Sequence, residues 1–302
     1  MAVPTPPPTP ATTVPPAVGP RRGWTHRAWR RIPRDLRTPV GWVAFAIALA
    51  WVVLCVAGPM IVPHDPLVQD LPRFQPPGQA AWFGTDELGR DLFSRVVAGA
   101  RITISLALLL VTLSMLVGSV VGVVAGFFGR WVDEVLMRVT DVVLAFPTVI
   151  LAMVTAAALG PSLFNAVLAA LVVSWPPYAR VVRSMVLSLR EADFVACGRL
   201  LGFSPLKSMR RDILPNVAGP TLVMASLDIG NAALLLSGLS FLGLGAKPPT
   251  PEWGSMVSAA VVNFDKWWLG LFPGLAILTV VISFNFLGDA LRDAFDPQAG
   301  RL

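Results

Sequence analysis

Long apolar blocks separated by polar segments dominate the pattern of this chain. The blocks lie at residues 40–62, 100–128, 138–159, 164–182, 216–244 and 268–288. A helix that crosses a lipid bilayer needs about 20 predominantly apolar residues, and each block is close to or above that length. The pattern therefore predicts an all-α integral membrane protein with six transmembrane helices.

The two ends of the chain differ from the blocks. Residues 1–20 contain eight prolines and no charged side chain, and seven arginines follow between residues 21 and 37. Such a segment has too little apolar surface to fold by burial. We predict a disordered Pro/Arg-rich cytoplasmic tail over residues 1–39, a transmembrane domain over 40–297 and a short cytoplasmic tail over 298–302.

The distribution of basic residues predicts the orientation of the spans. If both termini are cytoplasmic, 18 of the 24 Lys and Arg residues lie on the cytoplasmic side and 6 on the outer side. Cytoplasmic segments next to membrane spans carry an excess of Lys and Arg. We therefore expect a multi-pass protein with cytoplasmic N- and C-termini.

Composition narrows the class of protein further. The chain is 55% hydrophobic and 14% charged, with a mean hydropathy of +0.67, whereas a soluble domain carries about 25% charged residues. This excludes a disordered protein and an ordinary cytosolic enzyme. The net charge of +6 comes from residues that flank apolar blocks, so we attribute it to membrane topology and expect no nucleic-acid partner. Cys55 and Cys197 lack metal-ligand spacing, and no metal site is predicted.

The segment between the fourth and fifth blocks, residues 183–214, has the pattern of a helix, a turn, a second helix and a stop. Residues 188–201 suit one helix, which Gly202 is placed to end. Ser204 can cap the next helix with Pro205 at its first position, and Pro215 marks the stop before the fifth span. Small side chains at Ala192, Ala196 and Gly198 allow a partner surface to approach, so the segment is either a docking helix or a solvated amphipathic loop.

Polar side chains inside apolar blocks are a second group of candidates. Asp228, Asn231 and Asn285 lie within predicted spans, where polar groups are costly and usually face a cavity or the bundle interior. We expect them on a translocation pathway, with a structural hydrogen bond or an ion pair to a partner chain as the alternative for Asp228. A different pattern, glycine at 118, 122 and 126, predicts close helix packing.

Several motifs resemble the permease subunits of binding-protein-dependent ABC importers. Glu191-Ala192, Gly202 and Ile213-Leu214-Pro215 are similar to the cytoplasmic EAA loop of these subunits. The resemblance to the dipeptide/oligopeptide permease family, in its shorter C-type subunit, extends over residues 40–297. It is carried by Phe83–Arg95, Asp133–Asp141 with Phe146-Pro147, Leu239–Gly245 with Pro248–Gly254, and Leu287–Asp293 with Asp296-Pro297.

The resemblance implies a type I ABC importer permease fold in the bacterial cytoplasmic (inner) membrane. The segment between spans 4 and 5 would be a cytoplasmic coupling helix-turn-helix. The implied partners are a second homologous permease subunit, two ATP-binding cassette subunits and an extracytoplasmic substrate-binding protein. ATP and Mg²⁺ are used by the partner subunits, and no cofactor is bound by this chain. The coupling residues implied are Glu191, Ala192, Asp193, Ala196, Gly198, Gly202, Pro205 and Pro215.

The outer segment before the second span holds acidic and basic residues close together. The motif residues are Gly84, Thr85, Asp86, Gly89, Arg90 and Asp91. Asp86, Arg90 and Asp91 can cap and pair at the start of the second span, or this segment can contact the binding protein. We expect one of these two roles rather than catalysis.

Two positions depart from the family pattern. Asp212 lies near a position where the family often has His, and Leu236 replaces an acidic residue that often precedes the Leu-Ser-Phe-Leu-Gly run. We expect the first departure to alter pairing with the ATPase and the second to alter the lining of the pore.

The sequence leaves the energy source and the substrate open to alternatives. It contains no Gly-x-x-x-x-Gly-Lys-Ser/Thr phosphate loop, so we predict a transport subunit that is not itself an enzyme. The resemblance implies import of di- or oligopeptides, with nickel chelates, haem, glutathione or oligosaccharides as alternatives. A stand-alone ion-coupled secondary carrier and a structural membrane scaffold are the hypotheses from other classes.

Overall fold

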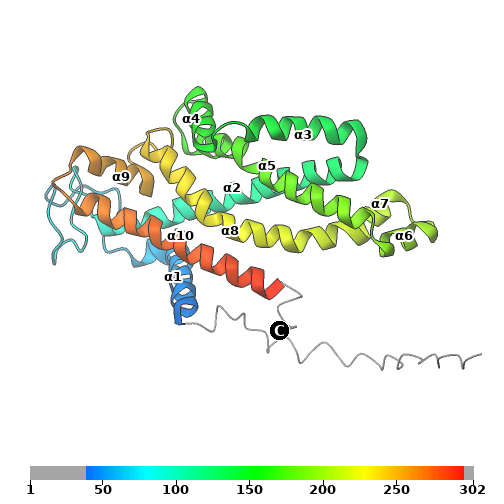
Figure 1. The fold of residues 1–302 in the computed structure, drawn as a ribbon. Helices are drawn as coiled ribbons and strands as arrows, with labels where there is room; N and C mark the ends of the chain where they lie inside the picture. Colours follow the sequence, from blue (N-terminus) through cyan, green and yellow to red (C-terminus); the bar gives the residue numbers. More distant parts are fainter. Residues whose placement is uncertain (1–38, 296–302) are drawn as a thin grey trace, which may run out of the picture. The chain divides into compact units, whose positions relative to one another are not determined.

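The computed structural model describes residues 39–295, which form helices joined by loops (Figure 1). The tails predicted over 1–39 and 298–302 lie outside this range, except for Pro39, which begins the first helix. In chain order the helices are α1 Pro39–Ile61, α2 Leu92–Phe128, α3 Arg130–Leu144, α4 Thr148–Leu159, α5 Leu163–Arg190, α6 Asp193–Leu200, α7 Pro205–Ser208, the π-helical turn η3 Met209–Ile213, α8 Leu214–Phe241, α9 Trp253–Val262 and α10 Trp268–Phe295.

The predicted spans are confirmed, with one change in shape. Within residues 39–295, five helices are long and apolar enough to cross a membrane, and a bent pair makes up to six. The pair is α3 and α4, which meet at an angle of 91°, so the single straight helix expected over 138–159 is wrong. Pro147 explains the break, because proline lacks an N–H and disfavours helical backbone at the preceding residue, Phe146.

Several helices extend well beyond their apolar blocks. α2 begins at Leu92, eight residues before the predicted block, and α5 continues to Arg190, eight residues beyond it. Charged residues within these helix ends hid them from a search for apolar runs. On α5 those residues are paired: Arg180 donates to Asp141 at 2.7 Å, and Arg183 forms an ion pair with Asp133. The two ion pairs tie α3 to α5.

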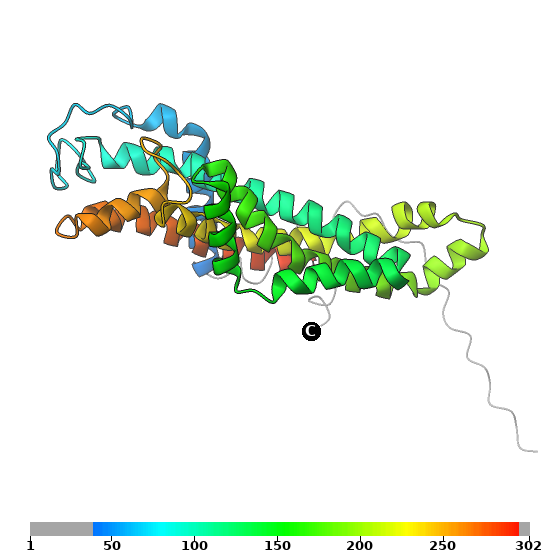
Figure 2. The ribbon, with the colours of Figure 1, turned by 90° about the horizontal axis from the view of Figure 1, so that it is seen from above.

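The most extensive contact between two helices in the described part of the chain joins α2 and α5, which run side by side (Figures 1 and 2). Gly118, Gly122 and Gly126 make this approach possible. A Cβ atom at Gly118 would lie 2.4 Å from Cβ of Tyr178, and one at Gly122 would lie 2.6 Å from the carbonyl oxygen of Ala179. The close packing predicted from the glycine spacing is therefore confirmed, and it fixes the register of α5 against α2.

Apolar packing divides into two clusters. The larger cluster joins α2, α5, α8 and α10 with the buried Trp253 of α9. The smaller one lies toward α6 and α7 and joins α2, α5, η3 and α8 through residues such as Val186 and Ile213. Many apolar side chains on the helices stay exposed, among them Val56 and Val120, as expected for surfaces that face lipid or another subunit.

The α2–α5 contact generates a stability prediction. Replacing Gly122 by Ala places a Cβ against backbone atoms of α5, and such overpacking costs about 1–3 kcal/mol. We expect Gly122→Ala to lower the thermal unfolding midpoint of the purified protein in detergent. Gly219→Ala on α8 is the matched control, because a Cβ there would have no atom within 4 Å and alanine favours helix by up to about 1 kcal/mol. Equal midpoints for the two variants would contradict the glycine contact.

Candidate functional site

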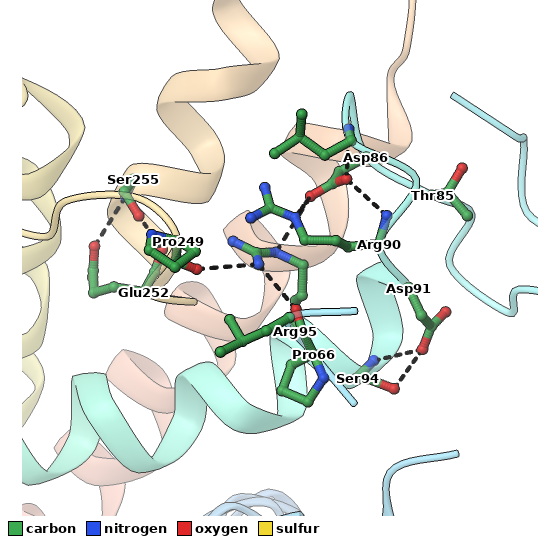
Figure 3. Close-up of polar contacts among 12 residues, drawn as sticks. Pro66, Thr85, Asp86, Arg90, Asp91, Ser94, Arg95, Pro249, Glu252 and Ser255 are labelled. Atoms are coloured by element: carbon green, nitrogen blue, oxygen red, sulfur yellow. Dashed lines mark hydrogen bonds and ion pairs between the residues drawn. The ribbon is translucent and has the colours of Figure 1, made fainter. Parts of the chain in front are cut away.

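The outer segment before α2 is organised around the buried carboxylate of Asp86 (Figure 3). Asp86 accepts hydrogen bonds from the backbone N–H groups of Leu88 and Arg90, each at 2.9 Å. Its other oxygen lies 2.6 Å from Nε of Arg90 and 3.5 Å from Nε of Arg95. The acidic and basic residues of the motif therefore pair with one another, as predicted from the sequence.

The two glycines of the outer motif allow the tight turn around this pair. Gly84 and Gly89 have φ of +79° and +77°, a left-handed region that glycine adopts without steric cost. A Cβ at Gly89 would also lie 2.1 Å from the carbonyl oxygen of Leu71. Thr85 accepts a hydrogen bond from the backbone N–H of Gln75 at 2.8 Å and donates to the carbonyl of Pro72 at 2.6 Å.

Asp91 and Arg95 connect this segment to α2 and to a second outer loop, residues 242–252 between α8 and α9. Asp91 is the N-cap of α2 and accepts from the backbone N–H of Ser94 at 2.9 Å and from its hydroxyl at 2.6 Å, which confirms the predicted cap. Nη1 of Arg95 donates to the carbonyls of Pro66 at 3.1 Å and Pro249 at 3.3 Å (Figure 3). One arginine thus holds together segments that are far apart in the sequence.

Glu252, which sequence reasoning missed, is the buried acid of the second outer loop. Its side chain caps α9 by accepting from the backbone N–H groups of Gly254 at 3.0 Å and Ser255 at 2.9 Å. Burial raises the pKa of the Glu252 carboxyl, and these backbone hydrogen bonds oppose that rise. The available signal was its position as an acid directly before an apolar helical run.

A cavity of about 530 Å³ lies where α2, α4, α5 and α8 meet. Asp228 and Asn231 of α8 line it, together with mainly apolar side chains. Asn285 is not among the lining residues. Its side chain instead packs against Gly230 of α8, where an added Cβ atom would lie 3.0 Å from Oδ1 of Asn285. Leu236 is also absent from the lining of this cavity and is 4% exposed in the apolar core, and its expected effect on the pore stays a prediction.

The inner segment folds as a helix, a turn and a second helix, at the opposite end of the bundle from α9 (Figure 1). Gly202 has a φ of +78° and follows the end of α6, and Ser204 caps α7 by accepting from the backbone N–H of Lys207 at 3.3 Å. Both features were predicted. The single helix expected over 188–201 is wrong, because α5 ends at Arg190 and α6 starts at Asp193.

The expected stop at Pro215 is also wrong. Residues Pro205–Phe241 form one continuous 37-residue helical stretch through α7, η3 and α8. Proline in a helix removes an N–H and its ring crowds the carbonyl four residues earlier. The wider π turn at Met209–Ile213, closed by the N–H of Leu214 on the carbonyl of Met209, accommodates that crowding just before Pro215.

The coupling candidates occupy different surroundings. Glu191, Asp193, Ala196 and Pro205 are exposed, Ala192 is half-buried and Gly198 is buried. Phe203 in the turn makes cation–π contacts with Lys207 and Arg211. Nζ of Lys207 lies 3.9 Å and Cζ of Arg211 lies 5.3 Å from the centre of its ring. The segment thus exposes polar and small side chains together with large apolar ones, among them Leu200 and Leu201.

Comparison with known proteins decides the family. Residues 118–301 match the family described as the binding-protein-dependent transport system inner membrane component. The chain belongs to this family. It is 42% identical over 265 residues to the probable D,D-dipeptide transport system permease protein DdpC of Escherichia coli K12, covering 87% of this chain and 89% of the relative.

Two further relatives agree with this assignment. The dipeptide transport system permease protein DppC of Alkalihalophilus pseudofirmus is 39% identical over 274 residues, 89% of this chain and 90% of the relative. The di/tripeptide transport system permease protein DppC of Pseudomonas aeruginosa is 41% identical over 256 residues, 82% and 84% respectively. As an inner membrane component, the chain is a multi-pass membrane protein and a transport subunit.

This inner membrane component has no evident metal centre in the part described. Within residues 39–295, no group of three or more His, Cys, Asp or Glu side chains lies close enough to hold a metal ion. The two cysteines, Cys55 and Cys197, are free thiols.

The raised pKa of Glu252 generates a pH prediction. A carboxyl whose pKa is higher in the folded than in the unfolded state stabilises the fold most at low pH, and this contribution falls as pH rises through the folded pKa. Glu252→Gln cannot ionise. We therefore expect the difference in thermal unfolding midpoint, wild type minus Glu252→Gln, to be greatest near pH 4 and to decline toward pH 8. A difference that stays constant over this range would contradict the burial of a titrating carboxyl.

Proposed function

We propose that this chain is the C-type permease subunit of an ABC importer that passes di- or oligopeptides across the bacterial cytoplasmic membrane. The observation that supports it best is mechanical. The exposed inner helix-turn-helix continues without a break through η3 into α8, and α8 carries Asp228 and Asn231 on the cavity wall. A displacement of α7 by a docked partner is therefore transmitted directly to the cavity.

The proposed cycle uses partners for energy and delivery. Two ATP-binding cassette subunits bind ATP with Mg²⁺ and move the inner segment, including Glu191, Ala192 and Gly202. The spans of this chain and of a second homologous permease rock between inward- and outward-facing states. A substrate-binding protein on the outer side, docked near the Asp86–Arg90–Arg95 cluster, delivers the substrate. The N- and C-termini lie in the cytoplasm.

The peptide substrate is inferred from the relatives, whose names specify dipeptides or di/tripeptides. The volume of the cavity, about 530 Å³, is within the range of about 300–1,000 Å³ for small-molecule sites. Most of its lining is apolar, which suits side chains of varied size. These features favour small peptides over a strongly charged or highly hydroxylated substrate.

The first test is affinity purification of the chain from its native membrane in mild detergent, followed by mass spectrometry. We expect to recover a second permease, ATPase chains and a binding protein. Reconstitution of that complex in proteoliposomes should then give ATP-dependent uptake of radiolabelled trialanine. An active preparation that contains this chain alone would overturn the proposal in favour of a solitary carrier.

Gly202 generates a prediction about coupling. Its φ of +78° is strained for a β-branched residue, although no atom lies within 4 Å of a Cβ there. We expect Gly202→Val to reduce both uptake and recovery of the ATPase chains, because the turn between α6 and α7 is distorted. Gly202→Asn is the matched control, since Asn tolerates this backbone region better than other side chains. Full activity of Gly202→Val would contradict the coupling role of the turn.

A further inference from the structure

Polar side chains gather on one wall of the otherwise apolar cavity between α2, α5 and α8. Ser114 and Tyr178 both line this cavity, and each residue is only 1% exposed. Among the described residues, the hydroxyl of Ser114 makes no hydrogen bond, and that of Tyr178 interacts with the carboxylate of Asp228. The two hydroxyls make the wall beside Asp228 polar.

The cavity also holds a carboxylate without a countercharge. Asp228 lines the same wall and interacts with the hydroxyl of Tyr178, which carries no positive charge. It also accepts a hydrogen bond from Nδ2 of Asn231, at 3.4 Å. None of the ion pairs in that part involves Asp228. An acidic side chain within a membrane bundle normally faces a cation, a hydrated cavity or a substrate.

We propose that Asp228 binds the positively charged amino group of the transported substrate in this cavity. An alkylammonium group has three N–H donors and no acceptor, which suits a cavity wall that holds the carboxylate of Asp228 and the side-chain amide of Asn231. The apolar remainder of the cavity accommodates the rest of a small peptide. This inference rests on the proposed function, and it assigns to α8 the recognition of one end of the peptide.

The test compares two probes that differ only in this group, trialanine and its des-amino analogue propionyl-alanyl-alanine. Binding of each to the complete importer in nanodiscs, without the binding protein, is measured by saturation-transfer NMR. We expect trialanine to bind the wild type on the order of tenfold more tightly, as expected for a charged hydrogen bond. Asp228→Asn should reduce trialanine to the level of the analogue, and Asp228→Glu should restore most of the preference.

Asp289→Asn is the matched control, because Asp289 is an exposed carboxylate on α10 that does not line the cavity. It should leave the preference unchanged. An unchanged preference in Asp228→Asn, or equal binding of both probes by the wild type, would overturn the inference. Loss of the second permease from purified Asp228→Asn would overturn it in favour of an ion pair between subunits. Failure of the wild type to take up trialanine in proteoliposomes would instead overturn the proposed function.

Discussion

The close approach of α2 and α5 is the contact on which the rest of the structure depends. Glycine at 118, 122 and 126 removes the side chains that would hold the helices apart. The resulting contact fixes the register of α5, and with it the positions of Tyr178 at the cavity and of Arg183 beside Asp133 of α3. A packing constraint with no polar group of its own thus determines where the polar groups meet.

The two ends of the bundle are stabilised in different ways. At the outer end, the buried Asp86 pairs with Arg90, and Asp91 and Glu252 cap helices (Figure 3). Arg95 joins loops that are distant in the sequence. At the inner end, α6 and α7 are largely exposed and make few contacts with the bundle. Elements with little buried surface open and move most readily, so the inner end is the part of the fold suited to respond to a partner.

The continuity between α7 and α8 links that responsive end to the interior. A flexible linker would absorb a displacement, whereas an unbroken helix carries it along its axis. The π turn at Met209–Ile213 is the local adjustment that keeps this helix unbroken past Pro215. Asp228 lies on the same helix, so the proposed coupling surface and the proposed substrate site belong to one continuous helical stretch.

Features that depend on nearby residues were predictable from the sequence. Apolar length determined the spans, and local hydrogen-bonding chemistry determined the caps at Asp91 and Ser204 and the turn at Gly202. The failures have equally physical causes. The helix over 188–201 and the stop at Pro215 were wrong because a backbone can break at polar residues or widen into a π turn without a clear sequence signal. The early start of α2 was missed because Arg95 interrupts the apolar pattern before residue 100.

What the sequence by itself determined is the membrane-spanning class, the order of the helices and the glycine face of α2. What only the tertiary structure decided is which polar residues share a site. Asp228 and Asn231 meet Ser114 and Tyr178 at one cavity, whereas Asn285 packs elsewhere and Leu236 is buried in the core. Hydropathy and spacing predict which face of its own helix a residue occupies, but not which residues of other helices it meets. The meeting of α2, α5 and α8 depends on how their surfaces pack, and that packing is not encoded in any single stretch of the chain.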